Sequence, residues 1–361
     1  MFDFEPGEDL ALIVETARSF AQAELQPRLR EHEGARSVQP AIRKAFAEMG
    51  LSGLELPESL GGAGLGALPR VLVNEELAAG DAGAALALDP LGPALYPLIE
   101  LGGEATLREL ALPLLEREGA RALLVDASDA ELEIGKAVTG RVPWVPSDCV
   151  DLLVITREDE ALVVRDGIER TELRGSGLRA AGASELRLAD APIVARFGDR
   201  DSAARAHARA RLYMASLLLG VLRQAADASL AYAMDRQAFG RPIAHHQGLA
   251  FLITDMRAAV DGARLLLHEA AWRVDRGLDC EAAAAAAFCE AVDASILVGP
   301  NGVQILGGHG FMQDYPLEKH MRESRTLGLV LGGIDAARED AGRALCGAGS
   351  PVSLSHAGGA A

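Results

Sequence analysis

The sequence predicts an α+β protein, mostly α, with an N-terminal helical domain, a small antiparallel β domain and a C-terminal four-helix bundle. Two observations indicate this order. Apolar residues recur at three- and four-residue steps near both ends of the chain, and short β-branched runs fill the middle. We place the domains at 1–113, 114–200 and 201–345, followed by a Gly/Ala/Ser-rich tail at 346–361 that we expect to fray.

The N-terminal segment begins with an amphipathic pattern. Leu10, Ile13, Ala17, Ala21 and Leu25 fall on one helix face. A break, LPESLGGAGLG, follows, with glycines at 61, 62 and 64. No strand in a βαβ context precedes these glycines, so we interpret the break as a turn and not as a phosphate-binding loop.

The middle segment has the sequence pattern of a β-sheet. Its runs RALLVDA, KAVTGRVPWV, DLLVIT, ALVVRDG and SELRLAD are β-branched or alternating and are separated by Gly, Pro and Asp. No helical period interrupts them, so we expect short antiparallel strands.

The last segment returns to helical periodicity. Three apolar stripes are expected to face one another: Leu212, Ala215, Leu219, Leu222, Ala226, Leu230 and Ala233; Leu249, Leu252, Met256, Val260, Ala263 and Leu267; and Phe288, Val292, Ile296 and Val303. With the segment after Arg322 they predict four long helices, whose usual packing is a bundle.

Charge and hydropathy restrict the function classes. The chain has 35 Lys+Arg against 52 Asp+Glu, a formal charge of −17, which disfavours binding to nucleic acid and to anionic membranes. The N-terminus is acidic where a targeting peptide would be basic. We expect no apolar run of the roughly 18–20 residues that span a bilayer. The sequence therefore predicts a cytoplasmic protein with no nucleic-acid or membrane partner.

Two long motifs carry a resemblance. DRQAFGRPIAHHQ (235–247), QILGGHGFMQDYPLEKHMRESR (304–325) and the spacing between them resemble the acyl-CoA dehydrogenase family of FAD-dependent flavoproteins. The weaker segments LPESLGGAGLG and VTGRVPWV fall where that family has related ones, so the resemblance covers nearly the whole chain. It implies FAD as cofactor, an acyl-CoA substrate, and α,β-desaturation with hydride transfer to FAD.

The first motif is expected to bind the cofactor. An Arg side chain suits a diphosphate because its planar fork donates two parallel charge-assisted hydrogen bonds. By resemblance, Arg236 holds the FAD pyrophosphate, Phe239 packs near the cofactor and Gln247 hydrogen-bonds to it. The alternative is a surface ion pair between Arg236 and Asp235.

The second motif implies an oligomer. In the family the segment containing Gln304, Gly307 and Gly308 reaches across a subunit interface to the adenosine end of a neighbour's FAD. The resemblance thus implies a homodimer or homotetramer, or a heterotetramer with a paralogous subunit, with electron-transfer flavoprotein as an electron acceptor. The alternative for these glycines is a helix C-cap.

Trp144, in the β domain, resembles the Trp that lies against the flavin, although a strand Trp also serves as core. Pro146 departs from the family pattern at this point because it has no backbone N–H to donate. LLVDASDAE is the nearest counterpart of the family's upstream Gly-rich segment. His245, His246 and His309 lack further ligands at metal-site spacing, so no metal site is predicted.

The reaction requires a carboxylate to remove the α proton of the thioester. By resemblance the catalytic Glu should stand at Leu331, in the triplet Leu331-Gly332-Gly333, or, in a minority of members, at Ala210, immediately before Arg211. Neither residue accepts a proton, so the catalytic base is unassigned, with Asp335 and Glu185 as candidates. Arg211, Gly332 and the backbone N–H of Leu331 are expected to bind the substrate.

Three functions remain open at this stage. The first is a dehydrogenase in which another residue supplies the base. The second is a non-catalytic subunit that completes the FAD site of a heteromeric acyl-CoA dehydrogenase. The third is a flavin monooxygenase of the same fold, which needs no α-proton base. No motif encodes the acyl group.

Overall fold

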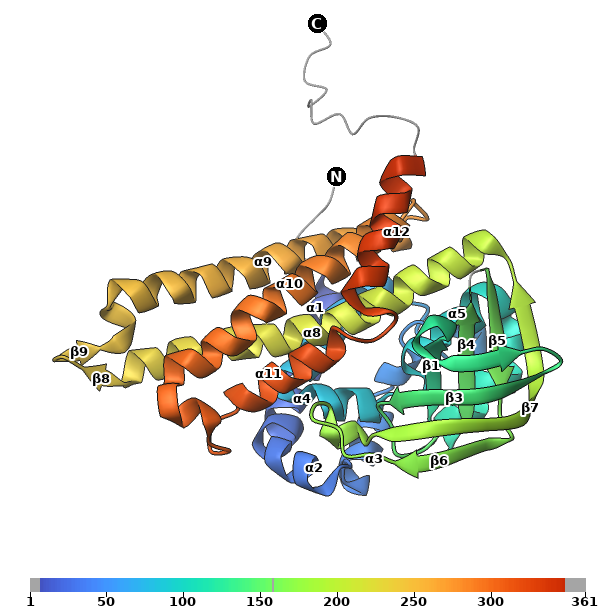
Figure 1. Cartoon of the computed structure of the whole chain (residues 1–361), viewed down its shortest axis with the longest axis horizontal. Coiled ribbons are helices and arrows are strands. Elements are labelled where there is room, and N and C mark those ends of the chain that lie inside the picture. Colours follow the sequence, from blue (N-terminus) through green and yellow to red (C-terminus); the bar gives the residue numbers. More distant parts are fainter. Residues whose placement is uncertain (1–6, 158, 348–361) are drawn as a thin grey trace, which may run out of the picture.

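The computed structural model describes residues 7–157 and 159–347 of the chain. Long helices form one side of the molecule and a curled sheet forms the other (Figure 1). The predicted order of helix, sheet and helix, with helix predominating, is confirmed.

The N-terminal part is helical as predicted. Its α-helices are α1 (Glu8–Phe20), α2 (Leu29–Ala35), α3 (Pro40–Glu48), α4 (Ala67–Leu88), α5 (Leu95–Pro97), α6 (Gly103–Thr106) and α7 (Leu112–Glu116). The Gly-rich break forms a turn, in which Gly61 and Gly64 adopt left-handed φ angles of 79° and 62°. α4 is buried along most of its length because it packs against the long helix α8 (Arg200–Asp235).

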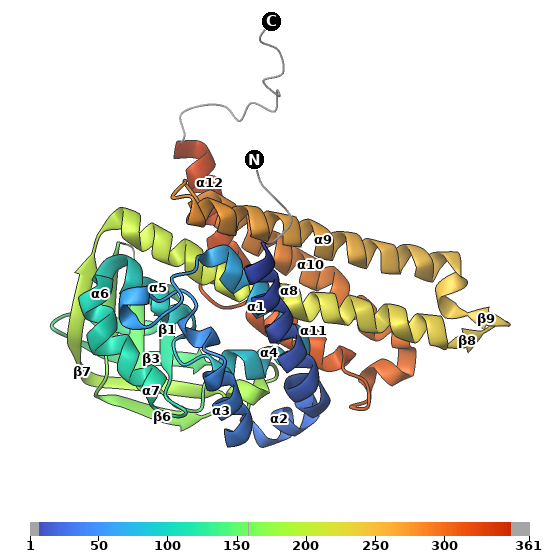
Figure 2. The same cartoon turned by 180° about the vertical axis from the view of Figure 1, so that it is seen from behind.

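The middle part is one sheet with a two-sided core. Its strands are β1 (Ala122–Asp126), β2 (Glu131–Ile134), β3 (Ala137–Val145), β4 (Leu152–Arg157), β5 (Glu160–Val164), β6 (Ile168–Glu172) and β7 (Ser184–Gly198). Side chains of β4 alternate between two apolar clusters: Leu152 and Val154 join one, Leu153 and Ile155 the other. The first cluster also includes buried leucines of the α5–α7 region, which covers that face (Figure 2).

The strand order, β1-β4-β5-β7-β3-β2 with β6 paired to β7, corrects one prediction. All strands were expected to be antiparallel, but β1 and β4 pair in parallel, with Ala122 opposite Leu152. Parallel neighbours need a long crossover connection, and the β2–β3 hairpin between them in the chain supplies it.

The C-terminal part is a bundle of α8, α9 (Gln247–Asp275), α10 (Glu281–Leu306), α11 (Leu317–Leu327) and α12 (Gly333–Gly347). Between α8 and α9 the short strands β8 (Gln237–Ala238) and β9 (Arg241–Pro242) form a hairpin that lies far from the sheet (Figures 1 and 2). The prediction of one long fourth helix is wrong, because a turn with left-handed backbone at Leu331, Gly332 and Gly333 divides α11 from α12. Two predicted core residues, Leu230 and Ile296, are exposed.

The expectation that no run is long and apolar enough to span a bilayer needs correction. Within the described residues one stretch, Glu281–Phe311, passes that test by length and composition, and α4 with the bent segment Gly92–Glu116 passes it as a pair. Packing explains the composition of α10, because it contacts α8, α9, α11 and α12. A helix surrounded by others in a bundle is apolar on most sides.

Candidate functional site

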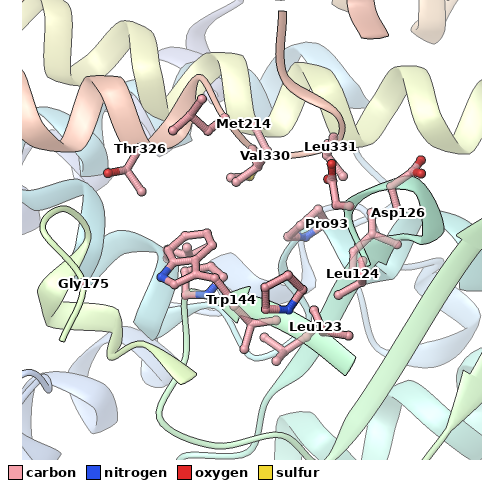
Figure 3. Close-up of a pocket in the computed structure, with 18 of the residues that line it drawn as sticks. Pro93, Leu123, Leu124, Asp126, Trp144, Gly175, Met214, Thr326, Val330 and Leu331 are labelled. Carbon is pink, nitrogen blue, oxygen red and sulfur yellow. The ribbon is translucent and has the colours of Figure 1, made fainter. Parts of the chain in front are cut away.

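A cavity of about 490 Å³ lies between the sheet and the bundle. Its wall includes Leu123, Leu124 and Asp126 of β1, Asp129, Trp144 of β3, Gly175, Ser176, Gly177, Met214 of α8, Thr326 of α11, Leu329, Val330 and Leu331. Figure 3 shows Leu331 and Asp126 at one side of this space and Trp144 and Gly175 at the other. The volume and the mostly apolar wall are typical of a site for a small molecule or cofactor.

The sheet and the bundle are hydrogen-bonded to each other at this cavity. β1 ends at Asp126, whose carboxylate accepts hydrogen bonds from the backbone N–H (2.9 Å) and the hydroxyl (2.6 Å) of Ser128. This turn carries Asp129 toward the bundle, where its Oδ2 accepts a hydrogen bond from the Gly332 N–H at 2.8 Å. The turn after β1 therefore meets the turn before α12.

The turn before α12 has an unusual backbone. Leu331, Gly332 and Gly333 have φ angles of 55°, 76° and 64°. A Cβ at Gly332 would lie 2.5 Å from the Ala336 Cβ, so the turn requires glycine there. Leu331 holds the left-handed conformation with a side chain, 5% exposed, in the cavity wall. The predicted base position thus lies in the cavity and holds an alkyl group.

Arg211 and Ala210 are buried in α8 and are not part of the cavity wall. Arg211 Nη2 donates to the Asp340 Oδ2 of α12 at 2.6 Å. Its expected contact with substrate therefore stays a prediction, as does that of Gly332, whose N–H is bound by Asp129.

The two carboxylates named from the sequence as substitute bases lie elsewhere. Asp335 is exposed in the first turn of α12. Glu185, in β7, is paired with Arg141 at 2.7 Å and Arg187 at 3.3 Å, and its hydrogen bond to Arg141 lowers its pKa. Neither residue lines the cavity.

Asp126 and Asp129, which the sequence interpretation did not name as site residues, do line the cavity. Asp129 is exposed to solvent, and partial burial of its carboxylate raises its pKa, with the neighbouring negative charge of Asp126 adding to the effect. The available signal is the segment LLVDASDAE, which has two aspartates three residues apart directly after a predicted strand.

His207 stands behind Asp126. This α8 residue is one turn before Arg211, and its Nδ1 is 3.9 Å from the Asp126 Oδ2. Burial lowers the pKa of His207 to about 4, and the positive charge of Arg211 contributes. Its Nε2 is buried without a hydrogen-bond partner among the described residues. The imidazole is therefore neutral at pH 7 and does not neutralise Asp126.

The remaining predicted cofactor residues gather at the far end of the bundle. Arg236, Phe239, Gln247, Gln304, Gly307 and Gly308 are all exposed, Phe239 by 97%. The second motif contacts the end of α8 just before the first motif, because Tyr232 hydrogen-bonds to the His309 Nδ1 at 2.7 Å. In the described part of the chain the Arg236 side chain makes no ion pair, so the predicted alternative with Asp235 is not formed.

Comparison with known proteins assigns the family. Residues 7–118 match the acyl-CoA dehydrogenase N-terminal domain, and residues 201–346 match the acyl-CoA dehydrogenase C-terminal domain. The chain belongs to the acyl-CoA dehydrogenase family. The resemblance inferred from the two motifs is thereby confirmed.

Relatives of this family cover almost the whole chain. A probable acyl-CoA dehydrogenase of Mycobacterium tuberculosis is 27% identical over 369 residues, covering 91% of this chain and 93% of its own. The butyryl-CoA dehydrogenase of Megasphaera elsdenii has the same fold, with a TM-score of 0.84, 23% identity, and coverage of 96% of this chain and 100% of its own.

A second similar structure contains the expected cofactor. PigA with FAD and proline has a TM-score of 0.84 at 22% identity, covering 96% of this chain and 99% of that protein. Membership of the acyl-CoA dehydrogenase family and this FAD-bound protein of the same fold confirm the expectation of an FAD flavoprotein.

Proposed function

We propose that this chain is an FAD-dependent acyl-CoA dehydrogenase that desaturates the α,β bond of an acyl-CoA thioester. The observation that supports this most directly is the cavity between sheet and bundle, which is lined from opposite sides by Trp144 and by Leu331, the predicted base position. An apolar wall excludes water, which strengthens the electrostatic interactions of any ionised group inside.

The residues present fit FAD. A cavity of about 490 Å³ with the indole of Trp144 in its wall suits a planar aromatic ring system. The unpaired, exposed guanidinium of Arg236 suits a diphosphate. When bound, FAD accepts the hydride that leaves the β carbon.

The positions of these residues favour a cofactor site shared between chains. Trp144 lines the cavity next to the sheet, whereas Arg236, Gln247, Gln304 and Gly307 lie at the opposite end of the bundle (Figure 1). We infer that this exposed end covers the adenosine part of a neighbouring subunit's FAD. The neighbour is a second copy, in a homodimer or homotetramer, or a paralogous subunit.

The first test is an absorption spectrum of the protein purified alone, recorded anaerobically before and after adding acyl-CoA esters of increasing chain length. We expect a flavin band that bleaches with at least one ester. Full retention of flavin without bleaching by any ester would refute the proposed desaturation.

A non-catalytic subunit is the second candidate, and Leu331 is the observation that favours it, because an alkyl side chain cannot accept a proton. This candidate predicts a colourless or flavin-poor protein when purified alone, and stable flavin binding only after co-expression with a paralogue. Nothing in the structure favours a flavin monooxygenase. Electron-transfer flavoprotein as acceptor and a cytoplasmic location stay predictions.

A further inference from the structure

We infer that Asp129, on the turn after β1, is the catalytic base that replaces the missing glutamate, a proposal that rests on the proposed desaturation. Asp129 lies in the wall of the same cavity as Leu331. It belongs to the sheet, so it would approach the substrate from a different element than residue 331 does.

The contact with Gly332 fixes the position of this carboxylate. Asp129 Oδ2 accepts the Gly332 N–H at 2.8 Å, so the carboxylate lies beside the peptide that joins Leu331 to Gly332. Among the described residues no hydrogen bond involves Oδ1, which leaves one oxygen to accept a proton. The same turn approaches Gly332 closely, since a Cβ there would lie 3.9 Å from the Ser128 Oγ.

Asp126 is the other carboxylate in the wall, and its oxygens have different roles. Its Oδ1 accepts two hydrogen bonds from Ser128 and forms the turn that presents Asp129. Its Oδ2 faces the Nδ1 of His207 at 3.9 Å. Asp126 is therefore a positioning residue and supplies a negative charge next to Asp129.

The electrostatics of Asp129 suit a general base. Burial and the charge of Asp126 raise its pKa, whereas the hydrogen bond from Gly332 lowers it. A carboxylate with a raised pKa is a stronger base than an unperturbed aspartate. On α8, His207 faces Asp126, and Arg211 one turn further along is paired with Asp340.

The step balances as follows. The α C–H bond breaks, its proton goes to the Asp129 carboxylate, and its electron pair becomes the new double bond. The β carbon loses a hydride to FAD, the oxidant. The thioester therefore loses two protons and two electrons in all.

The test measures proton removal separately from oxidation. The probe is an acyl-CoA whose β carbon is replaced by sulfur, which retains α protons but has no β hydrogen to transfer. FAD-loaded protein is incubated with this probe in deuterium oxide, and deuterium uptake is followed by mass spectrometry. The same proteins are mixed anaerobically with ordinary acyl-CoA esters to record flavin bleaching.

We expect the unsubstituted protein to exchange the α protons and Asp129→Asn to exchange them at least about 100-fold more slowly, in the range that a general base contributes. The matched control is Asp335→Asn, which changes an exposed carboxylate outside the cavity and should exchange at the original rate. Leu331→Glu added to Asp129→Asn should restore part of the exchange, because it returns a carboxylate to the family position.

Asp126→Asn provides a second test that leaves Asp129 in place. Asn keeps the acceptor for Ser128 but removes the negative charge that raises the pKa of Asp129, so the midpoint of exchange against pH should move to lower pH. An unmoved midpoint, or exchange in Asp129→Asn at the original rate, overturns the assignment. If bleaching persists in that variant, the desaturation stands and only the base is wrong. If FAD-loaded unsubstituted protein neither exchanges nor bleaches, the proposed function itself fails.

Discussion

At the scale of single residues, a buried ionic cluster lies between α4 and α11. Lys319 Nζ donates to Asp81 Oδ1 at 2.9 Å and to Glu323 Oε1 at 2.6 Å, and all three side chains are at most 1% exposed. Burial acts to lower the pKa of Lys319, but the two carboxylates outweigh it and raise the pKa to about 12. The lysine is therefore charged throughout the physiological pH range.

Lys319→Met should destabilise the protein by about 3–5 kcal/mol, because it leaves two carboxylates buried without their cation. Urea denaturation at pH 7.5 measures the loss, at fixed protein and FAD concentrations. The matched control is Lys44→Met, whose side chain is 78% exposed and 4.0 Å from Glu48. That exposed pair should contribute less than about 1 kcal/mol. Equal losses in the two variants would contradict the role given to the cluster.

For single residues of the site, the sequence could predict some features and not others. The absence of a base at residue 331 followed from the resemblance and one letter of sequence. The proximity of Asp129 did not, because its partner Gly332 lies 203 positions away and is reached only after the sheet docks on the bundle. A motif records local spacing, whereas this contact depends on how two elements pack.

At the scale of elements, helix existence was predictable from periodicity, and the break between α11 and α12 was not. The sequence LVLGGID continues the apolar pattern, but α11 ends at Leu327, and three successive left-handed residues precede α12. The parallel pairing of β1 with β4 was also missed, because alternation identifies a strand without giving its direction. The role of a glycine inside a helix is also not predictable from local sequence, because it depends on the helix that the glycine faces.

Gly220 and Gly262 should respond to alanine with opposite signs. A Cβ at Gly220 of α8 would lie 2.3 Å from the Glu75 carbonyl oxygen of α4, so Gly220→Ala must force the two helices apart. A Cβ at Gly262 of α9 would have no neighbour within 4 Å. Gly262→Ala should therefore stabilise by about 0.5–1 kcal/mol through helix propensity. We expect the midpoint temperature of thermal unfolding to fall for Gly220→Ala and to rise for Gly262→Ala. A rise for both variants would show that α4 and α8 can separate at little cost.

At the scale of the whole molecule, buried histidines set how stability depends on pH. Burial lowers the pKa of His320 to about 3 and that of His207 to about 4, both below the ordinary value of 6.5. Burial raises the pKa of Glu323 to about 7, and the negative charge of Asp81 adds to the effect, although Lys319 opposes it. Between pH 4.5 and 6.5 the two histidines and Glu323 change the free energy of unfolding in opposite directions.

In that range the unfolded chain takes up two protons at the histidines that the folded protein does not bind, and the folded protein binds one at Glu323. Summed over these three groups alone, the net excess of one proton in the unfolded state makes the free energy of unfolding fall as pH falls, by about 1.4 kcal/mol per pH unit. His320→Gln should remove one of the two opposing protons and flatten the dependence. Glu323→Gln should remove the compensating proton and steepen it. Denaturation midpoints between pH 5 and 7, measured with one protein and FAD concentration, provide the check. A steeper slope in His320→Gln would show that the histidine binds its proton in the folded state.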